Sequence, residues 1–209
     1  MKSEESNWRW LVCVFAFIAQ FLLGGFANCG GVVYAAVADR FNSSRGDTAW
    51  VGSLPGSVMY ITAPLSTSLC ERYGCRVVTI ASAVICIAAM VLSSFYSSLY
   101  HLFLTHGVIW GLGVSLGYFS TFVVISKHFK TRHSLANGII TCGSSVGTLT
   151  LSPVSQWLFK TFGLSSSFLI LAAIHSVLFA CGMVFRPVGH TTMTSPIAEK
   201  RIKYFDWTI

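Results

Sequence analysis

Six long apolar stretches separated by short polar segments run through the chain, over residues 10–38, 48–69, 77–95, 100–126, 135–159 and 165–185. An α-helix needs roughly 20 residues to cross a hydrocarbon core about 30 Å thick, and each stretch has about that length or more. Strands with open edges would leave backbone amides without partners in lipid, so every stretch is expected to be helical. The pattern predicts an all-α membrane protein, built as a bundle of six transmembrane helices.

The polar ends of the chain define the rest of its organisation. We expect residues 1–9 to form a cytoplasmic leader, residues 10–186 the transmembrane bundle, and residues 187–209 a short polar cytoplasmic tail. The first apolar stretch is too long for the core of a signal peptide and has no clean cleavage site, so it is expected to stay in the membrane.

Composition agrees with this interpretation and excludes several functions. With 54% hydrophobic and 10% charged residues, the chain has more apolar surface than a 209-residue globule can enclose. It shows no nucleophile with a base, no HExxH sequence, no carboxylate pair and no phosphate loop, so we expect no enzyme. The seven cysteines contain no CxxC pair and lie mostly in apolar runs, which indicates small core residues rather than a disulfide framework or a zinc site. No cofactor or metal is expected.

Basic residues are distributed unequally between the two sets of connections. Alternate connections, together with the two ends of the chain, hold eleven Lys and Arg residues, and the other connections hold only Arg40, Arg45 and Lys160. The positive-inside rule therefore places both termini in the cytoplasm of a multi-pass membrane protein, which we expect in the plasma membrane. The same rule accounts for the net charge of +7, so nucleic acid is not an expected partner. A glycosylation sequon at residues 42–44 lies in so short a connection that we expect it to be unused.

A few polar residues fall inside the apolar stretches. Such groups usually face a cavity or a neighbouring helix. For His106 and His175 we favour packing over a proton relay, because no acidic residue lies within the spans. Glycines spaced four apart share one helix face and predict close helix packing; these pairs are Gly52/Gly56, Gly107/Gly111, Gly113/Gly117 and Gly143/Gly147.

The connection between the second and third stretches reads Leu-Cys-Glu-Arg-Tyr-Gly-Cys-Arg over residues 69–76. An acid, a base, a glycine and a further base suit a tight hairpin in which glycine takes a left-handed conformation. This resembles the loop signature of the major facilitator superfamily, with Glu71, Arg72, Gly74 and Arg76 at matching positions. Thr67 and Cys75 stand where the signature has a glycine and a basic residue.

Residues 127–147 carry a second signature. Its spacing is similar to the fifth-helix motif of the monocarboxylate transporter family, at Phe129, Arg132, Leu135, Ala136, Gly138 and Gly143. The first-helix motif of that family survives only as Glu5, Trp8 and Trp10. The resemblance extends over residues 5–187 and implies the amino-terminal half of a major facilitator fold.

One position bears on transport coupling. Proton-coupled lactate carriers of the family have a lysine near the outer end of the first helix, where this chain has Asn28. An asparagine cannot carry a proton or pair with an anion as an ammonium group can. The resemblance therefore favours the branch that moves aromatic amino acids and iodothyronines by facilitated diffusion. A structural role for Asn28 between helices is compatible with either branch.

The family fold also implies candidate site residues. Polar residues of the first, second, fourth and fifth helices would line a central substrate cavity, which nominates Asn28, Tyr34, Tyr60, Tyr118 and Asn137. Each tyrosine suits packing or interface anchoring about as well. A cytoplasmic gate of ion pairs is implied at Glu71, Arg72, Arg76, Lys130 and Arg132, whose alternative role is topological charge.

The resemblance implies a membrane transporter, or a truncated form of one, that moves small carboxylates or aromatic amino acids by alternating access. Such carriers use two six-helix halves with the substrate between them. A single half is then expected to need a second copy or a full-length carrier as its partner. The alternative is a transport-inactive short isoform that binds or regulates a full-length carrier. The residues do not decide whether a single-span ancillary glycoprotein is required.

Overall fold

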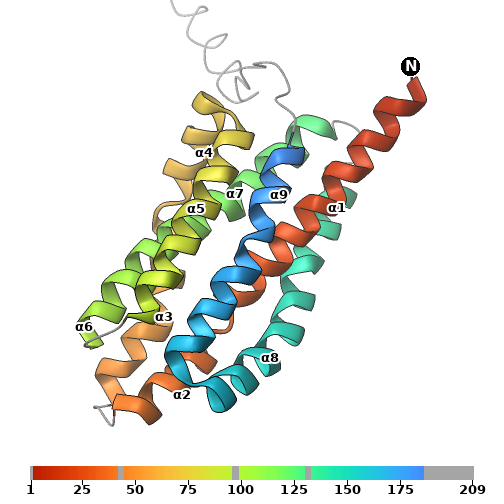
Figure 1. Ribbon diagram of the computed structural model, residues 1–209. Coiled ribbons are helices and arrows are strands. Elements are labelled where there is room, and N and C mark those ends of the chain that lie inside the picture. Colours follow the sequence, from red (N-terminus) through yellow and green to blue (C-terminus); the bar gives the residue numbers. More distant parts are fainter. Residues whose placement is uncertain (1, 42–44, 96–98, 130–132, 186–209) are drawn as a thin grey trace, which may run out of the picture.

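The computed structural model describes residues 2–41, 45–95, 99–129 and 133–185. Regular structure in these ranges is entirely helical, as Figure 1 shows. The elements are α1 (Lys2–Ala27), α2 (Gly30–Phe41), α3 (Arg45–Ile61), α4 (Ala63–Tyr73), α5 (Cys75–Ser94), α6 (Leu99–Leu102), the π-helix η1 (Phe103–Trp110), α7 (Gly111–His128), α8 (His133–His175) and α9 (Val177–Val184).

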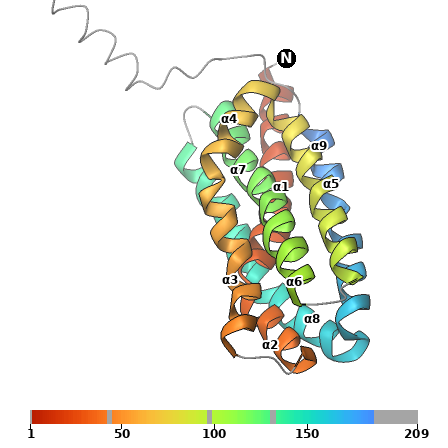
Figure 2. The same cartoon turned by 90° about the vertical axis from the view of Figure 1, so that its left-hand side faces the viewer.

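These elements form six passes along one bundle. The pairs α1–α2 and α3–α4, the single helix α5, and the series α6–η1–α7 make the first four passes. Helix α8 contains a break at Gly163, whose φ of 75° reverses the chain, so α8 supplies the fifth pass and, with α9, the sixth. Residues 10–38, 75–94, 99–128 and 133–184 are long and apolar enough to cross a membrane, the last range holding two passes. The views in Figures 1 and 2 show α3 and α4 running along the same bundle. The predicted six-helix membrane fold is confirmed.

The bundle has two distinct ends. The start of α1, the α4–α5 turn, the end of α7 and the end of α9 lie together in Figure 1, and we call this the terminal end. Helix α2, helix α6 and the turn at Gly163 lie at the opposite end. Arg72, Arg76 and Lys127 belong to the elements of the terminal end, and Lys160 belongs to the opposite one. These described side chains therefore keep the charge asymmetry expected from the sequence.

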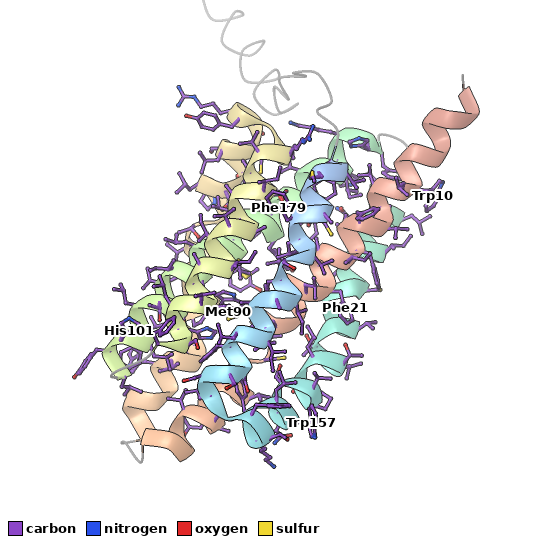
Figure 3. All side chains as sticks on the ribbon, viewed as in Figure 1. Trp10, Phe21, Met90, His101, Trp157 and Phe179 are labelled. Carbon is purple, nitrogen blue, oxygen red and sulfur yellow. The ribbon has the colours of Figure 1, made fainter. Side chains whose placement is uncertain are left out.

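Exposed aromatic side chains mark both ends. Figure 3 places Trp10 towards the terminal end and Trp157 near the opposite end, and these side chains are 43% and 60% exposed. Tyr73 and Tyr100 are exposed in the same two regions. Amphipathic rings favour the two membrane–water interfaces, so this arrangement fits a bundle that spans the bilayer.

The expected domain boundaries stay predictions. Helix α1 begins at Lys2, so it includes residues of the expected leader as well as the first apolar stretch. The expected tail at residues 187–209 and the sequon at residues 42–44 lie outside the described residues.

Glycines bring α1 against α8. A Cβ atom on Gly25 would lie 2.7 Å from the Cα atom of Gly147, and one on Gly143 would lie 2.8 Å from the backbone oxygen of Phe17. Helices α2 and α3 meet in the same way, because Gly30 and Gly52 face each other backbone to backbone. The close packing predicted from glycine spacing is confirmed at Gly52 and at both members of the pairs 107/111, 113/117 and 143/147. It does not extend to Gly56, which has open space around it.

Both intramembrane histidines lie in an aromatic cluster at the centre of the bundle. His106 stacks on Trp110 with ring centroids 5.0 Å apart, and the His175 ring meets Phe26 edge to face at 5.8 Å. The Nδ1 atom of His175 is 2.8 Å from the carbonyl oxygen of Leu171. Packing, which we favoured for these residues, is the arrangement that the structure shows.

Candidate functional site

Asn28 lies where α1 breaks and α2 begins. Its backbone nitrogen donates to the carbonyl oxygen of Gly24 at 3.2 Å, which ends α1, and its side chain is exposed. The Asn28 amide Nδ2 donates to Ser144 Oγ at 3.4 Å and to Thr148 Oγ1 at 3.3 Å. The break in the first pass thus points a polar side chain at a polar face of α8.

Gly24 lets two other side chains approach this point. A Cβ atom on Gly24 would lie 2.8 Å from Ser144 Cβ and 3.1 Å from Tyr118 Cε2, so Ser144 and Tyr118 flank the bare backbone. The Tyr118 side chain is half-buried and packs its ring on Phe119 and Phe122. We name Asn28, Tyr118, Ser144 and Thr148 the Asn28 cluster. It unites side chains from α1, α7 and α8.

Tyr60 lies near this cluster on α3. Its side chain is 65% exposed. The carbonyl oxygen of its neighbour Met59 accepts a hydrogen bond from Ser115 Oγ at 3.0 Å, three residues before Tyr118 on α7. Three of the five expected binding residues, Asn28, Tyr60 and Tyr118, are therefore brought into one region.

The other two lie apart from the cluster. Tyr34 is half-buried on α2, and its Cβ atom lies 3.3 Å from the place where a Cβ on Gly52 would stand. It therefore packs where α2 crosses α3. Asn137 lies on α8 seven residues before Ser144, which is about 10 Å along the helix axis. Its Oδ1 atom is buried without a hydrogen-bond partner among the described residues.

Ser144 and Thr148 were not among the expected site residues, although their spacing could have indicated them. Asn137, Thr141, Ser144 and Thr148 are separated by four, three and four residues, which places them along one face of a helix. The sequence shows this polar stripe but not that Asn28 on another helix would meet it.

A buried amide holds α1 against α7 beside the cluster. Gln20 Nε2 donates to Thr121 Oγ1 at 2.7 Å and to the carbonyl oxygen of Tyr118 at 3.2 Å. Since buried polar groups in lipid are costly when unpaired, these bonds fix the two helices in one register. They thereby set the position of Tyr118.

The expected gate lies around the α4–α5 turn. Gly74 joins the helices with φ 86° and ψ 144°, so the glycine has the positive φ expected of it. Glu71, Arg72 and Arg76 are exposed beside it, whereas Lys130 and Arg132 lie outside the described residues. The ion pairs of the gate stay a prediction.

A separate cavity of about 310 Å³ lies between α2 and α8 at the opposite end. Its lining is mostly apolar and carries one cationic side chain, with members Val32, Ala35, Ala36, Gln156, Phe159, Lys160 and Leu164. It shares no residue with the Asn28 cluster.

The chemistry of the Asn28 cluster is that of neutral hydrogen bonding. An amide, two aliphatic hydroxyls and a phenol can donate to a carboxylate and accept from an ammonium group. None of these four groups changes its charge near neutral pH. Among the described residues no group of three His, Cys, Asp or Glu could hold a metal ion.

Comparison with known proteins places the chain in a family. The family model described as Major Facilitator Superfamily matches residues 16–206. The chain belongs to the Major Facilitator Superfamily. This superfamily consists of transporters, which confirms the expectation that the chain is not an enzyme. The fold agrees with a crystal structure of the peptide transporter POT, at a TM-score of 0.73 and 12% identity over 93% of this chain and 43% of that one.

Several curated relatives of the chain are monocarboxylate transporters. The chain is 35% identical to monocarboxylate transporter 9 of Rattus norvegicus over 199 residues, which cover 95% of this chain and 39% of that protein. Monocarboxylate transporter 2 of Homo sapiens is 36% identical over 97% of this chain and 42% of its own length. Monocarboxylate transporter 3 of Rattus norvegicus is 37% identical over 88% of this chain and 37% of its own length. The chain thus spans about two fifths of these relatives.

Proposed function

We propose that the chain forms one six-helix half of a carrier of the monocarboxylate transporter type, which moves small carboxylates or aromatic amino acids by alternating access. The observation that carries this proposal is the Asn28 cluster. It gathers an exposed amide, two hydroxyls and a tyrosine from three helices at a break in the first pass. Substrate sites of such carriers lie where helices are discontinuous, because freed backbone and polar side chains can line a cavity there.

The charge of the cluster favours facilitated diffusion over proton coupling. Asn28 carries a neutral amide that bonds to the hydroxyls of Ser144 and Thr148. Amides, aliphatic hydroxyls and phenols take up no proton near neutral pH. An aromatic amino acid brings its own ammonium group and a ring that can stack on tyrosine. Aromatic amino acids are therefore the preferred substrate class of this proposal, with small carboxylates as the broader one.

A working carrier needs a second half that faces the Asn28 cluster. A second copy of the chain, or the other half of a full-length carrier, would supply that face. Placement in the plasma membrane with the terminal end in the cytoplasm is part of the same proposal, supported by the segregation of the described basic side chains.

The test is uptake of labelled tryptophan, tyrosine and lactate into proteoliposomes that contain only this chain, at two external pH values. Uptake of the aromatic amino acids at equal rates at both pH values is the expected result. Lactate uptake that rises with external acidity would overturn the choice of substrate class and of coupling.

A regulatory role is the second candidate. Three side chains at the end of α3 and the start of α4 are more than half exposed, and they form a surface that a protein partner could contact: Tyr60, Ile61 and Leu65. If the chain is a transport-inactive short isoform, a full-length carrier that it binds would cover this surface. Absence of all flux in an inserted, folded chain, together with co-purification with a full-length carrier, would select this role.

A further inference from the structure

The cavity between α2 and α8 has a fixed apolar wall on its α8 side. Phe159 and Leu164 line the cavity and are themselves 9% and 6% exposed. Phe159 meets Phe168 edge to face with ring centroids 5.8 Å apart. The turn at Gly163 separates Phe159 from Leu164, and Ser167 Oγ donates to the Gly163 carbonyl oxygen at 2.6 Å. This wall is therefore held in place by contacts within the bundle.

Helix α2 supplies the facing wall through Val32, Ala35 and Ala36. Two of these three side chains are single methyl groups, which leaves space between the helices. Val32 comes four positions after Asn28, so the cavity lies farther along the first pass than the Asn28 cluster. Any molecule in the cavity would contact α2 and α8 together.

The two polar members of the lining are Gln156 and Lys160, which are exposed and lie four residues apart on one face of α8. Lys160 is one helical turn nearer than Gln156 to the end of the bundle. The exposed ring of Trp157 lies near the same end in Figure 3, as expected at a membrane–water interface. No ion pair or hydrogen bond joins the Lys160 ammonium group to another described residue. The cavity thus combines an apolar interior with an uncompensated cation on its water side.

We propose that this cavity binds a fatty acid, a single-chain amphiphile with a carboxylate head. One carboxylate oxygen pairs with the Lys160 ammonium group and the other accepts from the Gln156 amide, while the alkyl chain lies along Val32 and Phe159. Ligand pockets are mostly apolar with a few placed polar groups, and their volumes begin at about 300 Å³. A cavity of about 310 Å³ therefore suits one alkyl chain better than a phospholipid with two. This site does not depend on the transport activity proposed above.

The test is binding of tritiated decanoate at neutral pH to the full chain in phosphatidylcholine nanodiscs that hold one copy each. Counts from empty discs are subtracted, because decanoate also partitions into lipid. Saturable binding of one decanoate per chain is the expected result. Decanol, which has the same chain length but no charge, should compete about fivefold less well, since it makes no ion pair.

Two substitutions test the two parts of the site. Lys160→Gln is expected to weaken decanoate binding about fivefold, whereas Lys127→Gln, which removes a cation at the terminal end, should leave it unchanged. Ala35→Leu should abolish saturable binding because the larger side chain fills the cavity. Ala81→Leu is its matched control, since Ala81 is an equally exposed alanine on α5.

Three results would overturn the proposal. Equal affinities for decanoate in the native and Lys160→Gln chains, or equal competition by decanol, would show that no carboxylate is recognised. Displacement of decanoate by phosphatidylglycerol in the discs would assign the cavity to a phospholipid headgroup. Loss of binding in discs that hold two copies would assign it to a contact between chains.

Discussion

Thr148 and Thr150 make the same bond to their own helix but differ in what surrounds them. Thr148 Oγ1 donates to the carbonyl oxygen of Ser144, and Thr150 Oγ1 donates to that of Val146, both at 2.9 Å. Thr148 also accepts from the Asn28 amide. Two positions apart on a helix is a rotation of about 200°, so Thr150 faces away from the Asn28 cluster. Comparing substitutions at Thr148 and Thr150 therefore distinguishes an effect on the Asn28 cluster from an effect on helix α8.

Thr148→Val is expected to lower tryptophan uptake by about fivefold, because losing one hydrogen bond costs about 1 kcal/mol. Initial uptake rates in proteoliposomes measure this. Thr150→Val is the matched control and should leave uptake unchanged. Equal losses in the two variants would assign the effect to α8 as a helix and not to the Asn28 cluster.

At the scale of elements, glycine has two different functions in this chain. Gly147 is needed for space, since a Cβ atom there would meet the Phe21 backbone oxygen and lie 3.0 Å from Gly25 Cα. Gly74 has open space around it and is needed for its φ of 86°. Gly56 and Gly138 have helical backbones, and a Cβ atom added at either would have no atom within 4 Å, so neither space nor conformation requires a glycine there.

Gly147→Ala is expected to lower the free energy of unfolding by about 1–3 kcal/mol, because the obstructing atoms are backbone and cannot rotate away. The midpoint of thermal unfolding in detergent reports it. Gly138→Ala should be neutral or stabilising by up to about 1 kcal/mol, since alanine is the better helix former. A Gly147→Ala variant as stable as Gly138→Ala would contradict the α1–α8 crossing described here.

Gly74→Ala is expected to destabilise by about 1–3 kcal/mol although the added methyl group meets nothing, because non-glycine residues rarely adopt this conformation. The same unfolding measurement on Gly56→Ala, where space is equally open but the backbone is helical, isolates the conformational cost. Indistinguishable midpoints would show that the turn relaxes to another conformation.

At the scale of the whole molecule, the lengths of the apolar stretches sufficed to predict six helical passes, whereas the orientation inferred from the charge distribution stays a prediction. Hydrophobic segments of sufficient length must be helical in lipid, so this part of the structure follows from local sequence. The Asn28 cluster was predictable only in part. Asn28 and Tyr118 could be nominated, but their meeting with Ser144 depends on a helix crossing that brings together residues more than a hundred positions apart. The positions of Tyr34 and Asn137 outside the cluster also depend on how the helices cross, which the sequence does not show.

The direction of the bundle gives a prediction at this scale. In a Cys142→Ser background, Lys160→Cys is expected to react with an impermeant maleimide added to intact cells, and Arg76→Cys only after permeabilisation. The reason is that the described basic side chains concentrate at the terminal end, which the positive-inside rule assigns to the cytoplasm. Labelling of Arg76→Cys in intact cells, with Lys160→Cys protected, would reverse the orientation.

The most direct test of the account is the pH dependence of tryptophan uptake by the native chain and by Asn28→Lys. The account predicts a flat profile for the native chain, because its cluster holds no group that titrates near neutral pH. It predicts uptake that rises with external acidity for Asn28→Lys, since a lysine amine placed among these hydroxyls can take up a proton and its ammonium form can release it. A native profile that already rises with acidity would contradict the assignment of Asn28 as a neutral, substrate-facing residue.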